Sequence, residues 1–415
     1  MSLPGSNMKV DKERLWSSLM EMAEIGATPK GGCNRQTVTD LDAQGRALFK
    51  KWVEAVGCTV TVDEMGNMMA LKPGRQADLP PVVIGSHLDT QPTGGKFDGV
   101  LGVLSGVEIL RTIKDTGYEH DHPIMVVNWT NEEGGRFAPA MMASGVWAKA
   151  FTKEWAYASA DRQGLTFGDE LERIGYKGAL PCEPQKWKCH LEFHIEQGPI
   201  LEAEQLPIGV VVGGQGIRWY ECKIHGKDSH AGSTPMPRRK DALVAASRVI
   251  ADLDEIARRH APHAVITVGQ IDVEPGSRNV IPSLARFSID MRHPQEDVIE
   301  LMDKELRASL EAACQRDELA FELDQTWYFP PVQFDATCVS AIRQAADELG
   351  YGHKDMVSGP GHDSCYTARH VPTAMIFCPC KDGLSHNEEE SIEPHEAEAG
   401  ANVLLRAALK LAQAS

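Results

Sequence analysis

Short apolar segments with the character of β-strands alternate with longer helical segments along about the first 200 residues of this chain. Residues 11–56 predict two helices around a polar stretch, and residues 100–113 predict a third. The predicted strands are 59–62, 68–71, 81–84, 124–129 and 190–195. Alternation of this kind favours an α/β fold in which helices flank a mixed, mostly parallel sheet.

The pattern changes near residue 213, where strands begin to alternate apolar and polar residues as half-buried antiparallel strands do. The next elements follow the order strand, helix, strand, strand, helix, at 216–224, 239–259, 265–268, 285–292 and 295–314. This order predicts an inserted α+β, ferredoxin-like domain with a sheet of its own. We therefore expect a catalytic domain in two parts, 8–213 and 326–415, around an inserted domain at 214–325.

Charge and composition exclude several classes of protein. The 415 residues carry a formal net charge of −17, which excludes a nucleic-acid binder that works by bulk charge. The longest apolar runs are far shorter than a membrane span, and residues 1–8 lack the basic and apolar regions of a secretory signal. Ten cysteines without C-x-x-C spacing indicate free thiols, so we expect a cytoplasmic protein.

Polar residues follow the predicted strand 81–84. His87 and Asp89 are two positions apart, so an extended backbone projects both side chains to one face. They come at the carboxyl end of a buried strand, where open α/β sheets bind ligands, and Asp89 is placed to orient a metal-bound His87. Asp98 adds a carboxylate in a glycine-rich loop before the next helix. The alternative is a helix N-cap at Asp98 and a surface pair of His87 and Asp89.

Two adjacent carboxylates, Glu132 and Glu133, follow the predicted strand 124–129. Neighbouring negative charges at the end of a buried strand repel each other unless a cation or a proton compensates them. A metal ion with one glutamate as ligand removes this repulsion and leaves the other glutamate as a general base on water. A solvated surface loop is the alternative for an isolated pair of this kind.

Two further histidines lie in comparable positions, His194 at the end of strand 190–195 and His386 near the C-terminus. A lone histidine is usually an ordinary core or surface residue. Three histidines and several carboxylates, each expected beyond a strand of one alternating domain, instead predict a metal site with nitrogen and oxygen ligands. Such ligands suit Zn²⁺, with Mn²⁺, Co²⁺ or Ni²⁺ as alternatives, and Asp98 is suited to bridge two ions about 3.5 Å apart.

Five motifs, in order along nearly the whole chain, resemble the hydantoinase/carbamoylase branch of the M20 metallopeptidase-like amidohydrolases. They are residues 85–90 (GSHLDT), 97–99 (FDG), 131–133 (NEE), 193–198 (FHIEQG) and 385–386 (SH). The segment that starts at His194 is the most specific to this branch, since His-x-Asp and Glu-Glu occur throughout the wider superfamily. The branch includes N-carbamoyl-L-amino-acid hydrolases, allantoate amidohydrolases and β-ureidopropionases.

The resemblance implies a role for each matching residue of the catalytic domain. The ligands it implies for two divalent metal ions, with Asp98 as the bridge, are His87, Asp98, Glu133, His194 and His386. Glu132 is then the general base and Asp89 orients His87. Gln197 is expected to contact the carbamoyl end of the substrate.

The same resemblance makes the inserted segment the lid and dimerisation domain of a homodimer. His230, in residues 227–233 (KDSHAGS), matches a residue that reaches the active site across the dimer, while Asn279 and Arg292 match positions that hold the substrate's amide region and carboxylate. An arginine suits that role because its guanidinium grips a carboxylate with two parallel hydrogen bonds. A surface ion pair on a strand is the alternative for Arg292. Residues Pro360 and Ser364 replace alanines of many relatives, and we expect both near the substrate pocket.

The implied reaction is metal-dependent hydrolysis of the carbamoyl C–N bond of an N-carbamoyl amino acid or related ureido acid. Allantoate and N-carbamoyl-β-alanine are alternative substrates, and an N-acyl-amino-acid deacylase or peptidase is an alternative activity with the same ligands. A metal-bearing binding protein is the non-enzymatic alternative, although Glu132 and every ligand are present. A serine hydrolase at residues 229–230 lacks the G-x-S-x-G motif, and a nucleotide site at 213–216 lacks the full glycine spacing.

Overall fold

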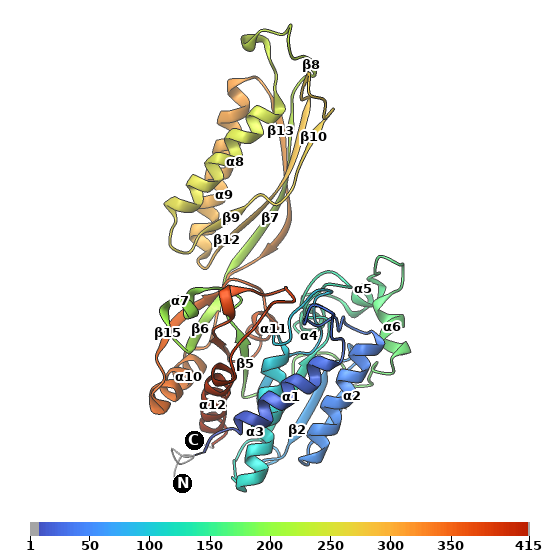
Figure 1. Ribbon diagram of the computed structural model, residues 1–415, viewed down its shortest axis with the longest axis vertical. Helices are drawn as coiled ribbons and strands as arrows, with labels where there is room; N and C mark the ends of the chain where they lie inside the picture. Colours follow the sequence, from blue (N-terminus) through green and yellow to red (C-terminus); the bar gives the residue numbers. More distant parts are fainter. Residues whose placement is uncertain (1–7, 414–415) are drawn as a thin grey trace. The chain divides into compact units, whose positions relative to one another are not determined.

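The computed structural model describes residues 8–413, which form two compact units (Figure 1). The first unit holds the residues up to Gly213 and those from Gln333 onward, and the second is Gly214–Val332. The second unit ends beyond the residue 325 expected from the sequence, because strand β13 (Ala320–Phe329) continues its sheet past that point. The prediction that residues 1–8 lack a secretory signal falls almost entirely on residues 1–7, which lie outside the described residues. Across residues 8–413, no helix combines the length and apolar character needed to cross a membrane.

A nine-stranded sheet forms the centre of the first unit, in the order β1-β2-β4-β3-β5-β16-β6-β14, with β15 paired to β6. The strands are β1 (Thr59–Val62), β2 (Met68–Lys72), β3 (Val82–His87), β4 (Ile124–Trp129), β5 (Cys189–Ile195), β6 (Ile208–Gly214), β14 (Val332–Gln333), β15 (His353–Ser358) and β16 (Thr373–Cys378). The four central strands β4, β3, β5 and β16 are parallel, whereas β1, β2 and β6 join antiparallel. The central strands are buried along their whole length, as strands covered on both faces are.

Helices cover this sheet, and their ends follow local sequence signals. Asp11 and Thr39 cap the first two helices, because their side chains accept hydrogen bonds from the first-turn N–H groups. The helices are α1 (Lys12–Glu24), α2 (Asp40–Ala55), α3 (Val100–Thr116), α4 (Met142–Trp147), α5 (Lys153–Ala158), α6 (Phe167–Arg173), α7 (Ile200–Glu204), α10 (Ala336–Leu349), α11 (Asp363–Thr367) and α12 (Pro394–Leu411). Helix α3 packs on β3, β4 and β5, and α12 packs on β16 and β5. The predicted α/β architecture is confirmed.

The second unit is an antiparallel sheet with two helices on one face. Its sheet has the order β10-β12-β7-β13, with β9 paired to β12, and β8 pairs separately with β11. The elements are β7 (Gly216–His225), β8 (Ser229–His230), α8 (Ala242–Arg259), β9 (Val265–Thr267), β10 (Ile271–Glu274), β11 (Val280–Ile281), β12 (Leu284–His293), α9 (Glu296–Arg316) and β13. Helix α8 lies between β8 and β9 in the chain and α9 lies between β12 and β13, so the two helices alternate with the strands of an α+β unit.

Candidate metal centre and active site

The carboxyl ends of the parallel strands bring the predicted ligands of the first unit together. His87 is the last residue of β3, His194 lies near the end of β5, and the loop that carries His386 follows β16. The carboxylates of Asp98, in the loop before α3, and Glu133, in the loop after β4, complete the group. All are buried except His386, whose side chain is half exposed.

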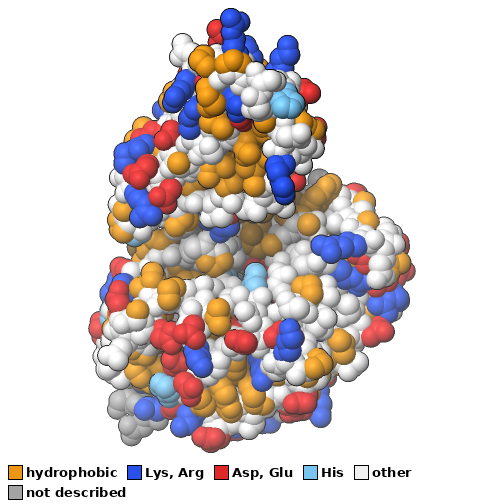
Figure 2. All heavy atoms as spheres, turned by 45° about the horizontal axis from the view of Figure 1, so that its top comes forward, with side chains coloured by type: hydrophobic (Ala, Val, Ile, Leu, Met, Phe, Trp, Pro, Cys, Tyr) orange, Lys and Arg blue, Asp and Glu red, His pale blue; other side chains and the backbone are white. Residues whose placement is uncertain are grey.

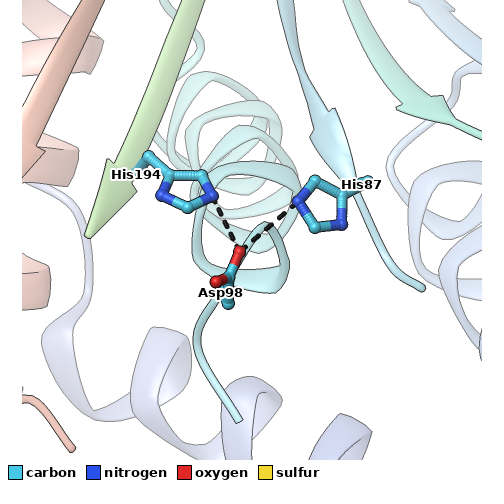
Figure 3. A group of neighbouring side chains, drawn as sticks. All are labelled: His87, Asp98 and His194. Carbon is cyan, nitrogen blue, oxygen red and sulfur yellow. Dashed lines mark ion pairs between the residues drawn. The ribbon is translucent and has the colours of Figure 1, made fainter. Parts of the chain in front are cut away.

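Asp98 lies between two sets of side chains. Its Oδ1 atom is 3.0 Å from Nε2 of His194 and 3.6 Å from Nε2 of His87 (Figure 3). Its Oδ2 atom is 3.7 Å from Nε2 of His386, which also lies 3.2 Å from Oε2 of Glu133. One carboxylate therefore presents each oxygen to a different set of ligands, which is the arrangement that a bridge between two cations requires.

Gly99 makes this approach possible. Its backbone has a φ of +68°, and a Cβ atom there would lie 2.2 Å from Nε2 of His87. Gly99 is also the N-cap of α3, which has no side-chain cap, so Asp98 does not cap this helix. The Asp98 carboxylate instead accepts hydrogen bonds from Nε2 of Gln197 at 2.7 Å and from Oγ of Ser385 at 2.6 Å.

Asp89 holds the site together through both its backbone and its side chain. The Nδ1 atom of His87 lies 2.9 Å from the main-chain oxygen of Asp89, closer than the 3.8 Å to its carboxylate. The carboxylate accepts from the N–H groups of Glu132 at 3.3 Å and Glu133 at 3.2 Å. The carbonyl of Asp89 therefore orients His87, and its side chain fixes the Glu132–Glu133 turn.

Glu132 is buried beside the predicted ligands, which excludes a solvated loop for the two glutamates. Its Oε2 atom lies 3.5 Å from Nε2 of His87. Burial raises the pKa of Glu132 well above its ordinary value, and the nearby carboxylates of Asp363, Glu133 and Asp98 raise it further. A carboxyl group with a raised pKa is suited to take up and release a proton near neutral pH.

The donor set fits two divalent cations. The possible ligand atoms of His87, Asp98 and His194 lie within 4.8 Å of one another, and so do those of Asp98, Glu133 and His386. Imidazole nitrogens and carboxylate oxygens are the usual ligands of Zn²⁺ and related ions. The Nε2 atom of His87 is buried and has no hydrogen-bond partner within residues 8–413, as a nitrogen reserved for a metal would be.

The predicted site residues of the second unit do not lie together. His230 of β8 pairs with β11, and the main-chain oxygen of Asn279 accepts from the N–H of Ala231 at 2.9 Å. Arg292 lies near the far end of β12, where its guanidinium binds both carboxylate oxygens of Asp290, at 2.9 and 2.7 Å. Strands rise roughly 3.3 Å per residue, so the stretch from Leu284 to Arg292 spans roughly 25 Å. One unit therefore does not bring His230 and Arg292 together.

Comparison with known proteins settles the family. A model of peptidase family M20/M25/M40 matches residues 83–410. The chain belongs to this family. It is 50% identical over 413 residues to an N-carbamoyl-L-amino-acid amidohydrolase of Rhizobium meliloti, covering 100% of this chain and 99% of the relative. An allantoate amidohydrolase of Bacillus subtilis is 31% identical, covering 94% of this chain and 95% of the relative.

A crystal structure of an amidase of the hydantoinase/carbamoylase family from Burkholderia multivorans superposes with a TM-score of 0.95. The two sequences are 55% identical, and the match covers 98% of each chain. At this identity the M20 fold described above is shared over its whole length.

Two residues outside the predicted set contact candidate metal ligands of this M20 chain. The side-chain amide of Gln91 donates to Oε2 of Glu133 at 2.9 Å and to the main-chain oxygen of Glu133 at 3.0 Å. The ring of His362 lies 4.6 Å from the ring of His194, and burial lowers the pKa of His362 well below its ordinary value. The only sequence signal was proximity to residues already singled out, because Gln91 follows Asp89 by two positions and His362 lies between Pro360 and Ser364.

Ser364 is fully buried in this M20 chain. Its hydroxyl donates to Oε2 of Glu192 at 2.6 Å, so it belongs to a buried polar network. Glu192 also accepts from Oγ of Ser86 at 2.9 Å. Gln197 is turned toward Asp98, and its Oε1 atom is buried without a partner in the described part of the chain.

Proposed function

We propose that this chain is a two-metal amidohydrolase that cleaves the carbamoyl C–N bond of an N-carbamoyl-L-amino acid. The observation that carries the proposal is the position of Asp98, whose two oxygens face separate sets of ligands beside the buried carboxyl of Glu132. The relative from Rhizobium meliloti supports the substrate class, since its identity extends over the whole chain. Zn²⁺ is the cation that we propose first, with Mn²⁺, Co²⁺ and Ni²⁺ as alternatives.

A ureido carbonyl is a poor electrophile because both nitrogens donate into it. Two divalent ions at this site would polarise the carbonyl and lower the pKa of water. Glu132 takes a proton from the attacking water and later gives a proton to the leaving nitrogen. The balance is R–NH–CO–NH₂ plus H₂O giving R–NH₂, CO₂ and NH₃.

Residues of the second unit would hold the rest of the substrate. The planar guanidinium of Arg292 already binds the carboxylate of Asp290 with two hydrogen bonds, and a substrate carboxylate presents the same geometry. His230 is exposed and suited to donate to the oxyanion that develops on the carbamoyl oxygen, with Asn279 beside it. Gln197, in the first unit, would meet the carbamoyl end through its side-chain oxygen, which has no hydrogen-bond partner among residues 8–413.

We further propose a homodimer through the second unit, which acts as lid and dimerisation domain. An N-carbamoyl amino acid is far shorter than the roughly 25 Å that β12 spans from Leu284, the end near β11 in the chain, to Arg292. We therefore infer that one chain does not supply both Arg292 and His230 to one substrate. His230 then comes from the partner subunit, and Arg292 serves the site of its own chain. Lysine and arginine side chains gather at the β8–β11 end of the unit (Figure 2), where Lys227, Arg238 and Arg316 line a hollow of about 630 Å³ together with Asp317 and Glu318.

A subunit-mixing experiment tests the dimer and the roles together. Glu132→Gln and His230→Ala are each expected to be nearly inactive. After unfolding and refolding the two variants together, mixed dimers would contain one site with an intact Glu132 and the partner subunit's intact His230, so part of the activity returns. Mixing Glu132→Gln with Arg292→Ala should restore no activity. Both residues serve the site of their own chain, so each site of a mixed dimer carries one of the two substitutions. Recovery in neither mixture would contradict a site shared between subunits.

A substrate panel tests the activity. Ammonia release should be fastest from N-carbamoyl-L-α-amino acids and slower from allantoate and N-carbamoyl-β-alanine. Faster cleavage of N-acetyl-amino acids or dipeptides would assign the chain to the deacylases or peptidases instead.

The ten cysteines are all free thiols, which supports our proposal that the enzyme works in the reducing cytoplasm.

A further inference from the structure

Glu390 is a buried carboxylate outside the predicted set of ligands and bases. It lies in the loop that carries His386, and only 4% of its surface is exposed. Its Oε1 atom accepts hydrogen bonds from the N–H of Phe97 at 2.9 Å and from the N–H of Asp98 at 3.0 Å. A side chain near the C-terminus therefore fixes the backbone of the residue that lies between the two sets of metal ligands.

The same loop also holds the Asp98 side chain. The hydroxyl of Ser385 donates to Oδ2 of Asp98 at 2.6 Å, and it lies 3.5 Å from Oε2 of Glu390. Glu390 thus accepts a hydrogen bond from the backbone of Asp98, and Ser385 donates one to its carboxylate. Since His386 lies between these two residues in the chain, one short loop supplies a ligand and also sets the position of the bridge.

The fold reserves space for this carboxylate. A Cβ atom on Gly95 would lie 2.1 Å from the carboxyl carbon of Glu390, so a side chain at position 95 would displace it. Burial of a carboxylate is costly unless hydrogen bonds compensate it, and here two backbone N–H groups do so. A buried carboxylate that is bonded to the backbone of Asp98 and has space reserved for it points to a role at the site.

We propose that Glu390 is a positioning residue for the metal centre, which keeps the Asp98 bridge at a fixed distance from His386. This inference rests on the proposed two-metal function. The two oxygens of Asp98 reach their separate imidazoles only if the Phe97–Asp98 backbone is held in place. Groups that orient metal ligands in this way typically contribute 10- to 100-fold in metal affinity.

The experiment measures Zn²⁺ affinity by chelator competition and metal content after dialysis, alongside thermal unfolding of the metal-free protein. Glu390→Ala should weaken Zn²⁺ binding by roughly 10- to 100-fold. Glu390→Gln should bind within a few-fold of the unmodified chain, because its amide oxygen can still accept both N–H bonds. Glu389 is an exposed neighbour, so Glu389→Ala is the matched control and should leave the Zn²⁺ affinity and the thermal unfolding unchanged.

Gly95→Ala gives a second test that leaves Glu390 in the chain. The added methyl group should displace the carboxylate and weaken Zn²⁺ binding as Glu390→Ala does, so the proposal remains testable if Glu390→Ala fails to fold. Unchanged Zn²⁺ affinity in Glu390→Ala or in Gly95→Ala overturns the proposal. Equal loss in Glu390→Gln and Glu390→Ala also overturns it, because the effect would then come from charge. If the unmodified chain itself binds no Zn²⁺ or other divalent ion, the proposed function fails first, and the two failures are thereby distinguished.

Discussion

Oε2 of Glu132 lies 3.5 Å from Nε2 of His87, while the N–H of Glu132 donates to the carboxylate of Asp89. The backbone of Glu132 is thus fixed by one residue of the 85–90 motif, and its carboxyl faces another. Its neighbour Glu133 is turned toward His386 instead, at 3.2 Å. Two adjacent glutamates therefore have different surroundings, which is the separation needed for one to act as base and the other as ligand.

Glu132→Gln should keep both metal ions and lose turnover. The amide cannot take a proton from water, and general-base catalysis typically contributes 10²- to 10⁴-fold, so kcat should fall by roughly that factor. Steady-state kinetics and metal analysis of the same preparation provide the measurement. Glu154→Gln, on the exposed side of α5, is the control. A variant with near-normal kcat would remove Glu132 from the base role.

Arg292→Ala should raise KM for carboxylate substrates by at least tenfold and leave metal content unchanged, since the lost hydrogen bonds hold the substrate rather than the reacting carbonyl. Arg286 lies on the same strand and the same face of the sheet, where it pairs with Glu274 at 2.7 Å, so Arg286→Ala is the matched control. An equal increase in KM in both variants would show a general effect of charge, and no increase in either would place the substrate carboxylate elsewhere.

His190 should make the fold less stable in acid. Burial lowers the pKa of His190 from 6.5 to about 3, so the unfolded chain binds a proton below about pH 6.5 while the folded chain stays neutral. The stability that His190 contributes is present above pH 6.5 and is lost as pH falls toward 3, by roughly 1.4 kcal/mol per pH unit. Urea unfolding of His190→Gln at pH 7 and pH 5 should show a shallower loss than the unmodified chain.

His395→Gln, at an exposed position of α12, provides the control for this pH series. It should lose stability between pH 7 and pH 5 as steeply as the unmodified chain does. If His190→Gln loses stability as steeply as the control, the folded protein binds a proton at His190 in this range, and a neutral buried imidazole is excluded.

The sequence could predict that the proposed ligands of the first unit lie together because the topology leaves little choice. His87 and His194 end parallel strands, and such ends meet at one edge of an α/β sheet. Gln91 and Glu390 could not be predicted in this way, because they act through hydrogen bonds between loops distant in sequence. The separation of His230 from Arg292 was hidden as well, because it follows from the register of β12 against β7, which no local pattern specifies.

His386→Ala should lower the metal content from two ions per chain toward one. His386 approaches only Glu133 and one oxygen of Asp98, whereas His87 and His194 surround the other oxygen, so one set of ligands remains nearly complete. Elemental analysis after dialysis against a weak chelator measures this ratio. Activity should fall when the ion beside Glu133 is lost. It should not return when Zn²⁺ is added at the concentration that restores the activity of the dialysed, unmodified chain. Loss of both ions together would instead indicate that the bridge at Asp98 cannot hold a single cation with His87 and His194 alone.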